Sequence, residues 1–206
     1  METLTGPLLV VEDVPDTLQL LDVTLTFKGY RVVTARNGNE ALAAIQKERP
    51  AIIITDILMP QMDGFSLVHR LRLNPDTRGI PVIFLSATYV TPEDKEFAAA
   101  IGVTRFLEKP IVIEELLKTV AELLSRGMLA DSKPLDARKF YEGYRTRLET
   151  KLKQKVSQIA RTESMLQTLS EAEKPAFRAS LQSAIEERDE IQLLLDQLRD
   201  LLAGDK

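Results

Sequence analysis

The chain has 206 residues, of which 44% are hydrophobic and 28% charged, and it contains no cysteine. This composition predicts a folded protein and excludes a disulfide framework, a thiolate nucleophile and a cysteine-ligated metal, and the net charge of −4 gives no whole-chain support for nucleic-acid binding. No apolar run approaches the roughly 20 residues that cross a bilayer, and the N-terminus lacks the features of a signal peptide, so we expect a cytoplasmic protein without a membrane segment.

Up to about residue 125, short apolar runs alternate with amphipathic segments. The apolar runs predict strands near residues 8–12, 31–35, 51–56, 81–86 and 104–108. The amphipathic segments predict helices near residues 15–28, 39–48, 64–73, 93–101 and 112–125. Strand–helix alternation at this spacing predicts an α/β fold, a doubly wound five-stranded parallel sheet with helices on both faces.

From about residue 134 the pattern changes, and no further strand is predicted. We expect a domain over residues 1–125, a linker over 126–134 and an all-α helical hairpin over 135–206. The two long helices are predicted at about 135–168 and 175–203. At the break between them Ser170 and Glu173 have capping-box spacing, and Pro175 suits the first turn of the second helix.

Polar side chains gather at the predicted carboxyl ends of the strands, where doubly wound sheets bind their ligands. They are Glu12 and Asp13 after the first strand, Asp56 after the third, Ser86 after the fourth and Lys109 after the fifth. If the first and third strands are neighbours, three carboxylates converge and repel one another unless a cation intervenes. An all-oxygen cluster favours Mg²⁺. With a lysine and a hydroxyl added, it predicts a site for a phosphoryl group.

Four motifs in this region occur together in one known family. They are "VVEDVPD", "TDILMPQMDG", "LSAT" and "FLEKP". The order and spacing of these motifs resemble those of the CheY-like receiver domain of two-component response regulators. The resemblance covers the chain from about residue 6 to 125. The resemblance implies that Asp56 accepts a phosphoryl group from a histidine kinase. It also implies that Glu12 and Asp13 hold Mg²⁺, helped by Asp56 and the Leu58 carbonyl.

The same resemblance assigns roles to three residues on later strands. Ser86 matches the hydroxyl that moves to bond the phosphoryl oxygens, and Lys109 matches the lysine that pairs with them. Phe106 matches the aromatic switch position. The family often has tyrosine there, so an account that uses its hydroxyl does not transfer. The Lys109–Pro110 bond resembles the family's cis peptide.

The last predicted helix repeats apolar residues at alternating steps of four and three from Phe177 to Leu202, a heptad pattern interrupted by Arg188. Residues 138–161 contain eight Arg or Lys against two acidic residues, whereas residues 171–205 contain nine acidic residues against four basic ones. A basic and an acidic helix joined by a short turn are expected to pair antiparallel. Because neither helix alone buries its apolar face well, we expect a homodimeric four-helix bundle through 135–206, with coiled-coil packing.

Three functions remain open for this hairpin. The first is dimerisation and docking of an unknown downstream protein. The second is a degenerate kinase-like hairpin that serves as a phosphorelay scaffold, since the absence of histidine from residues 70–206 excludes phosphotransfer there. The third is DNA binding through the basic helix 138–161, which the acidic neighbouring helix argues against. No catalytic motif for an output enzyme is found, so we predict that the protein is not an enzyme.

Overall fold

The computed structural model describes residues 6–126, 136–168 and 174–204. The chain divides into two compact units, Met1–Asp136 and Ala137–Lys206, and each is described by itself. No helix in the described ranges is long and apolar enough to cross a membrane.

The first unit contains a five-stranded parallel sheet with the strand order β2-β1-β3-β4-β5. The strands are β1 (Leu8–Val11), β2 (Val32–Ala35), β3 (Ile52–Asp56), β4 (Val82–Ser86) and β5 (Arg105–Glu108). The helices are α1 (Pro15–Phe27), α2 (Gly38–Lys47), α3 (Gly64–Leu73), α4 (Pro92–Ala100) and α5 (Ile113–Arg126). This arrangement confirms the doubly wound fold predicted from the sequence.

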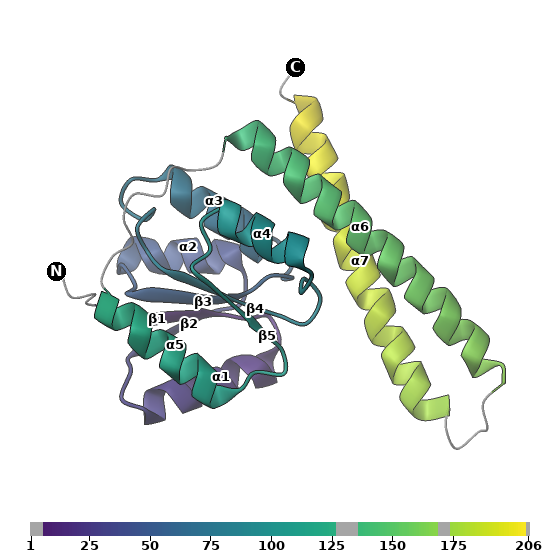
Figure 1. Cartoon of the computed structure of the whole chain (residues 1–206), viewed down its shortest axis with the longest axis horizontal. Coiled ribbons are helices and arrows are strands. Elements are labelled where there is room, and N and C mark those ends of the chain that lie inside the picture. The colour runs from purple at the N-terminus through teal and green to yellow at the C-terminus, as the bar shows by residue number, and fades with distance from the viewer. Residues whose placement is uncertain (1–5, 127–135, 169–173, 205–206) are drawn as a thin grey trace. The chain divides into compact units, whose positions relative to one another are not determined.

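The helices lie on both faces of the sheet (Figure 1). Helices α1 and α5 cover one face, where Leu21, Leu25, Leu116 and Val120 pack on alternate residues of the central strands. Helices α2, α3 and α4 lie over the other face. Because both faces are covered, the central strand β3 contains consecutive apolar residues, Ile52–Ile54. These three side chains are fully buried.

Side-chain caps fix the starts of α2, α3 and α4. The Asn37 side chain accepts a hydrogen bond from the Glu40 N–H and begins α2. Asp63 begins α3 in the same way, and Thr91 forms a capping box with Asp94 at the start of α4. These caps satisfy backbone donors that would otherwise be unpaired close to the carboxyl edge of the sheet.

The second unit consists of two packed helices, α6 (Ala137–Leu166) and α7 (Lys174–Gly204), which run antiparallel (Figure 1). This confirms the predicted hairpin. An ion pair joins its helices, with Lys155 Nζ 2.6 Å from Glu187 Oε2. The predicted capping box of Ser170 and Glu173 lies outside the described residues. Helix α5 extends to Arg126, one residue beyond its predicted end, and the division of the chain at 126–134 stays a prediction.

Candidate functional site

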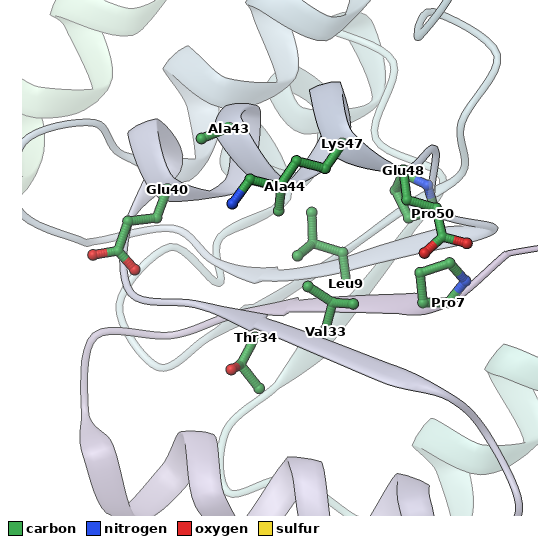
Figure 2. Close-up of a pocket in the computed structure, with 10 residues that line it drawn as sticks. All are labelled: Pro7, Leu9, Val33, Thr34, Glu40, Ala43, Ala44, Lys47, Glu48 and Pro50. Carbon is green, nitrogen blue, oxygen red and sulfur yellow. The ribbon is translucent and has the colours of Figure 1, made fainter.

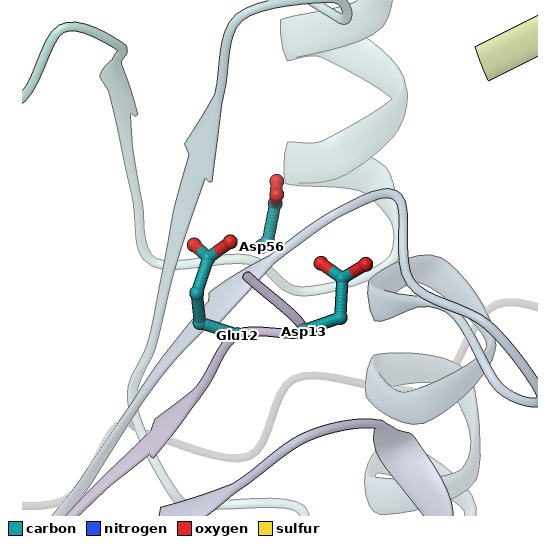
Figure 3. Close-up of side chains that lie close together, drawn as sticks. All are labelled: Glu12, Asp13 and Asp56. Atoms are coloured by element: carbon teal, nitrogen blue, oxygen red, sulfur yellow. The ribbon is translucent and has the colours of Figure 1, made fainter. Parts of the chain in front are cut away.

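Three acidic side chains meet at the carboxyl ends of β1 and β3. Glu12 and Asp13 directly follow β1, and Asp56 is the last residue of β3. The two strands pair in parallel, with Val11 opposite Thr55, so their ends reach the same edge of the sheet. The three side chains offer carboxylate oxygens that all lie within 4.8 Å of one another, and Figure 3 shows the carboxylates facing a common space. The predicted convergence is therefore present.

One ammonium group bridges two of these carboxylates. Lys109 follows β5, and its Nζ lies 2.8 Å from Glu12 Oε2 and 2.8 Å from Asp56 Oδ2. The Glu12 side chain is fully buried, and those of Asp56 and Lys109 are 14% and 21% exposed. Water therefore screens these charges weakly, and Lys109 offsets part of the repulsion between the carboxylates. The other oxygen of Asp56, Oδ1, accepts a hydrogen bond from the Ile57 N–H at 2.7 Å.

Burial raises the pKa of each carboxyl group in the cluster, and repulsion by a neighbouring carboxylate adds to the rise for Glu12 and Asp56. The pKa of Glu12 rises to about 7, first because the group is buried and second because the Asp56 carboxylate is close, while Lys109 opposes the rise. Burial also raises the pKa of Asp13 and that of Asp56, again opposed by Lys109. Burial acts to lower the pKa of Lys109, but the Asp56 and Glu12 carboxylates outweigh it and the pKa is raised. An additional cation at this place would stabilise the ionised carboxylates.

The side chains present fit a small, hard metal ion. Their available donors are carboxylate oxygens, the ligand type that Mg²⁺ prefers. Oε1 of Glu12 is buried and has no hydrogen-bond partner within the described part of the chain. A buried oxygen in that state costs free energy unless a water or a cation satisfies it. The orphaned oxygen and the donor chemistry both agree with the predicted Mg²⁺ site.

A close backbone approach shapes the loop after Asp56. The Gly64 N–H donates a hydrogen bond to the Ile57 carbonyl at 2.8 Å, and a Cβ at Gly64 would overlap the Asp56 carbonyl oxygen. Glycine therefore allows α3 to begin directly against the end of β3. Leu58 lies in this loop, two residues beyond Asp56, and is half-buried. The role of its carbonyl as a metal ligand stays a prediction.

The hydroxyl of Ser86 is bonded to the loop that follows its own strand. Ser86 ends β4 and is buried. Its Oγ accepts hydrogen bonds from the Thr88 and Tyr89 N–H groups at 3.1 and 3.0 Å. Its backbone carbonyl accepts a hydrogen bond from the Lys109 N–H at 2.9 Å. The backbone thus ties the serine to the lysine, while the serine side chain is held by loop amides. The Lys109–Pro110 peptide bond is cis, as expected.

Phe106 lies on the edge strand β5 and is half-buried. Its ring centroid is 6.4 Å from that of Phe84, in an edge-on arrangement. Lys95 of α4 places its Nζ 5.7 Å from the Phe106 centroid and 2.6 Å from Glu108 Oε1. The ring therefore lies where β5 and α4 meet, in contact with a cation that favours its face. Its role as a switch stays a prediction.

Two buried side chains near the site were missed by the sequence analysis. Asp63, the cap of α3, accepts a hydrogen bond from the Ser66 N–H at 2.7 Å, and burial raises its pKa to about 7. Tyr89, in the loop after β4, is fully buried. An aspartate directly before a helix is a capping signal, so the sequence could have indicated Asp63. The neighbours of Tyr89 in the sequence give no comparable signal, because its burial depends on α3.

A separate cavity of about 450 Å³ lies between α2 and the strands β1 and β2. Figure 2 shows Leu9 and Val33 on the strands, with Ala44 and Lys47 on the helix above them. None of the predicted site residues lines this cavity. The acidic cluster at the sheet edge therefore remains the candidate site.

The sequence matches the family model of the response regulator receiver domain over residues 8–121, which is more than half of the chain. The chain belongs to the response regulator receiver family. The matched range contains the five strands, the acidic cluster, Ser86 and Lys109, and it ends before α6 and α7.

Curated relatives match mainly this first unit. An uncharacterized 14.6 kDa protein from Leptolyngbya boryana is 39% identical over 59% of this chain and 93% of its own length. The response regulator PleD from Caulobacter vibrioides is 38% identical over 62% of this chain and 28% of its own length. The probable transcriptional regulatory protein TcrX from Mycobacterium tuberculosis is 32% identical over 57% of this chain and 49% of its own length. The chain therefore spans about half of TcrX and less of PleD.

Solved structures agree on the fold. The chemotaxis response regulator CheY4 of Vibrio cholerae is 39% identical, with a TM-score of 0.54, over 58% of this chain and 98% of that one. The signal receiver domain of a signal transduction histidine kinase from Syntrophus aciditrophicus is 38% identical, with a TM-score of 0.55. The match covers 59% of this chain and 92% of that one. Both are similar to the first unit and show that its architecture is that of a receiver domain.

Proposed function

We propose that this protein is a two-component response regulator in which Asp56 accepts a phosphoryl group from a histidine kinase. The observation that carries the proposal is the meeting of Glu12, Asp13, Asp56 and Lys109 at one sheet edge. This set combines an oxygen nucleophile, ligands for a divalent ion and an ammonium group for the phosphoryl oxygens. Phosphoryl transfer depends mainly on such positioning and charge neutralisation.

In the proposed reaction a carboxylate oxygen of Asp56 attacks the phosphorus of a phosphohistidine. A phosphorus–oxygen bond forms and the phosphorus–nitrogen bond breaks, with its electron pair going to the imidazole, which takes a proton from solvent. Lys109 would exchange a carboxylate oxygen for a phosphoryl oxygen, and the Ser86 hydroxyl would donate to another. Mg²⁺, held by Glu12, Asp13, Asp56 and the Leu58 carbonyl, would supply positive charge to the phosphoryl oxygens.

The surface of α1 supports a helical protein as the phosphodonor. Leu20, Val23 and Phe27 are 56%, 60% and 86% exposed and are spaced by three and four residues, so they share one side of the helix. Val14, 48% exposed, directly follows Asp13 at the start of the same helix. An exposed apolar stripe on the helix that directly follows Asp13 suits a kinase helix that delivers phosphohistidine to Asp56.

The hairpin of α6 and α7 is proposed to read out phosphorylation as a dimerisation and partner-docking module. The helices have 30 and 31 residues, about 45 Å at 1.5 Å per residue. Apolar side chains at heptad spacing line α7, and Ala184, Ile191, Leu195 and Leu198 are buried. On α6, Val156 is 50% exposed and is placed one helical turn from Leu152 and Ile159. A second hairpin would cover this surface in a four-helix bundle with coiled-coil packing.

Ion pairs within the hairpin disfavour a nucleic-acid role for the basic helix. Arg138 pairs with Glu142 at 2.9 Å, and Lys155 pairs with Glu187 at 2.6 Å. Part of the positive charge is thus already neutralised, which weakens attraction to phosphates. The phosphorelay scaffold remains an alternative that is compatible with a dimeric hairpin. We propose a signalling role rather than an output enzyme, and the cytoplasmic location stays a prediction.

Intact-mass analysis after incubation with Mg²⁺ and acetyl phosphate tests the proposal. The wild type should gain one phosphoryl group, and Asp56→Asn should gain none. The matched control Asp76→Asn makes the same change at an exposed aspartate and should behave as the wild type. Equal phosphorylation of wild type and Asp56→Asn would place the acceptor elsewhere.

A further inference from the structure

We propose that Tyr89 is a positioning residue for Ser86, and that its buried ring fixes the loop amides to which the Ser86 hydroxyl is bonded. The inference rests on the proposed function, because the position of this hydroxyl matters for signalling only if Asp56 becomes phosphorylated. It concerns the four residues between β4 and the cap of α4, residues 87–90.

One side chain anchors this loop in the protein interior. Ala87 is exposed, Thr88 and Val90 are half-buried, and Tyr89 has no exposed surface. Among these four residues Tyr89 alone is fully buried, so its ring is the deepest contact of this loop with the core. Loops open more easily when they lose buried contacts, so removing this ring should let the loop move more readily.

The ring of Tyr89 packs into a cluster of aromatic side chains from three elements. Its centroid is 5.2 Å from that of Phe65, edge-on, and Phe65 lies 5.3 Å from both Phe84 and Phe97. These rings belong to α3, β4 and α4. Phe65 also directly follows Gly64, the residue in close contact with the Asp56 carbonyl. The cluster therefore connects the backbone at the phosphoacceptor with the loop after β4.

The backbone N–H of the same tyrosine donates a hydrogen bond to the Ser86 hydroxyl oxygen. Oγ of Ser86 accepts hydrogen bonds from the N–H groups of Thr88 and Tyr89 at 3.1 and 3.0 Å. For the serine hydroxyl to move toward a phosphoryl oxygen, these two bonds must break or the loop must move with it. Because the loop is anchored by the Tyr89 ring, that ring adds to the cost of moving Ser86. Removing the ring should release the hydroxyl.

Phe106 is less directly connected to this hydroxyl. It is half-buried on β5, and its ring reaches the cluster through Phe84, at a centroid distance of 6.4 Å. Tyr89 has its ring in the aromatic cluster and its backbone N–H hydrogen-bonded to Ser86 Oγ. A movement of the cluster can therefore move the Ser86 hydroxyl, and the reverse. The positioning role therefore falls to Tyr89.

Amide hydrogen exchange in the ¹⁵N-labelled full chain, with no phosphodonor, tests the positioning role by itself. Tyr89→Leu keeps an apolar side chain but removes the ring, and it should speed exchange of the Thr88 N–H by about tenfold or more. Tyr89→Phe restores a ring and should stay within about twofold of the wild type. Phe97→Leu removes a ring from the same cluster but leaves the Tyr89 backbone in place, and should leave the Thr88 rate unchanged. Equal rates in Tyr89→Leu and the wild type would overturn the proposal.

The second measurement is the rate of phosphorylation by acetyl phosphate, followed by intact mass. Tyr89→Leu should increase the rate about threefold, and this increase should vanish when Ser86→Ala is added, because both changes act through one hydroxyl. An equal increase in the Ser86→Ala background contradicts the proposal. If the wild type takes up no phosphate, the proposed function fails, and the exchange rates still decide whether Tyr89 holds the loop.

Discussion

The Lys109 ammonium group lies 2.8 Å from an oxygen of Glu12 and 2.8 Å from an oxygen of Asp56, although these residues are 97 and 53 positions away in the sequence. The lysine thus partly neutralises two carboxylates that would otherwise repel each other in a buried place. A phosphoryl group arriving at Asp56 would find this cation already in position. Lys109 therefore contributes both to the resting site and to the proposed phosphorylated one.

The first prediction concerns this lysine. Lys109→Met removes the cation and leaves Glu12 and Asp56 without their partner, so phosphorylation by acetyl phosphate should slow by about tenfold or more. Intact-mass kinetics measure the rate. The control Lys118→Met changes an exposed lysine on α5 and should have no effect. An unchanged rate in Lys109→Met would show that the lysine does not take part in the transfer.

The second prediction concerns metal binding. Asp13→Ala removes one carboxylate from a site with three, and Mg²⁺ uses few protein ligands, so the dissociation constant should rise about tenfold or more. Isothermal titration calorimetry measures it. Asp16→Ala removes an exposed carboxylate in the first turn of α1 and serves as the matched control. Equal affinities of the two variants would exclude Asp13 as a ligand.

The third prediction concerns the lifetime of the phosphorylated state. Leu58 lies two residues beyond Asp56, and its aliphatic side chain cannot orient a water molecule for attack on the acyl phosphate. Leu58→Asn adds an amide that can do so, and phosphate loss should become severalfold faster. The decay is followed by intact mass after the phosphodonor is removed. Leu58→Met keeps the side chain apolar and should decay as the wild type does, so equal decay of Leu58→Asn would refute this explanation.

The fourth prediction concerns stability and pH. Burial raises the pKa of Asp63 to about 7, far above that of an aspartate in an unfolded chain. The folded state therefore binds the proton of the Asp63 carboxyl group more tightly than the unfolded state does. The free energy of unfolding consequently falls as pH rises from about 4 to above 7. The contribution lost between pH 5 and pH 8 is roughly 3 kcal/mol, at about 1.4 kcal/mol for each pH unit between 5 and the folded-state pKa.

Asp63→Asn tests this dependence because asparagine keeps the cap without ionising. Relative to this variant, the wild type should lose free energy of unfolding as pH rises, measured by urea denaturation at several pH values. Ser66→Ala removes a hydroxyl that lowers the Asp63 pKa, and should extend the loss of stability to higher pH. Parallel pH profiles of wild type and Asp63→Asn would contradict the assignment.

The fold and the acidic cluster followed from local patterns in the sequence. The run Ile52–Ile54 indicates a strand buried on both faces, and strand–helix alternation requires parallel pairing, so the ends of β1 and β3 could be placed together. The clustering of Phe65, Phe84, Tyr89 and Phe97 could not be predicted, since it depends on how α3 and α4 pack on the sheet. The bonds from the Ser86 hydroxyl to loop amides depend on the loop conformation, which no periodicity indicates.

The last prediction is that the hairpin of α6 and α7 makes the protein a dimer whether or not Asp56 is phosphorylated. Two helices of this length bury only part of their apolar side chains against each other, and Val156 remains 50% exposed beside the contact surface. Sedimentation velocity at micromolar concentration should find a dimer for the full chain and a monomer for residues 1–126. The first unit of the chain is compact by itself, so a truncated protein that keeps it is expected to fold.

Two variants of the full chain separate dimerisation from folding of the hairpin. Val156→Lys places a charge on the surface that the second hairpin is expected to cover, and should shift the protein to monomer while circular dichroism shows unchanged helix content. Leu193→Lys is the matched control, because Leu193 is 53% exposed and lies two residues from Ile191, on the opposite side of α7 from the heptad positions. A wild type that sediments as a monomer would refute constitutive dimerisation. A Val156→Lys variant that remains dimeric would move the interface to another side of the hairpin.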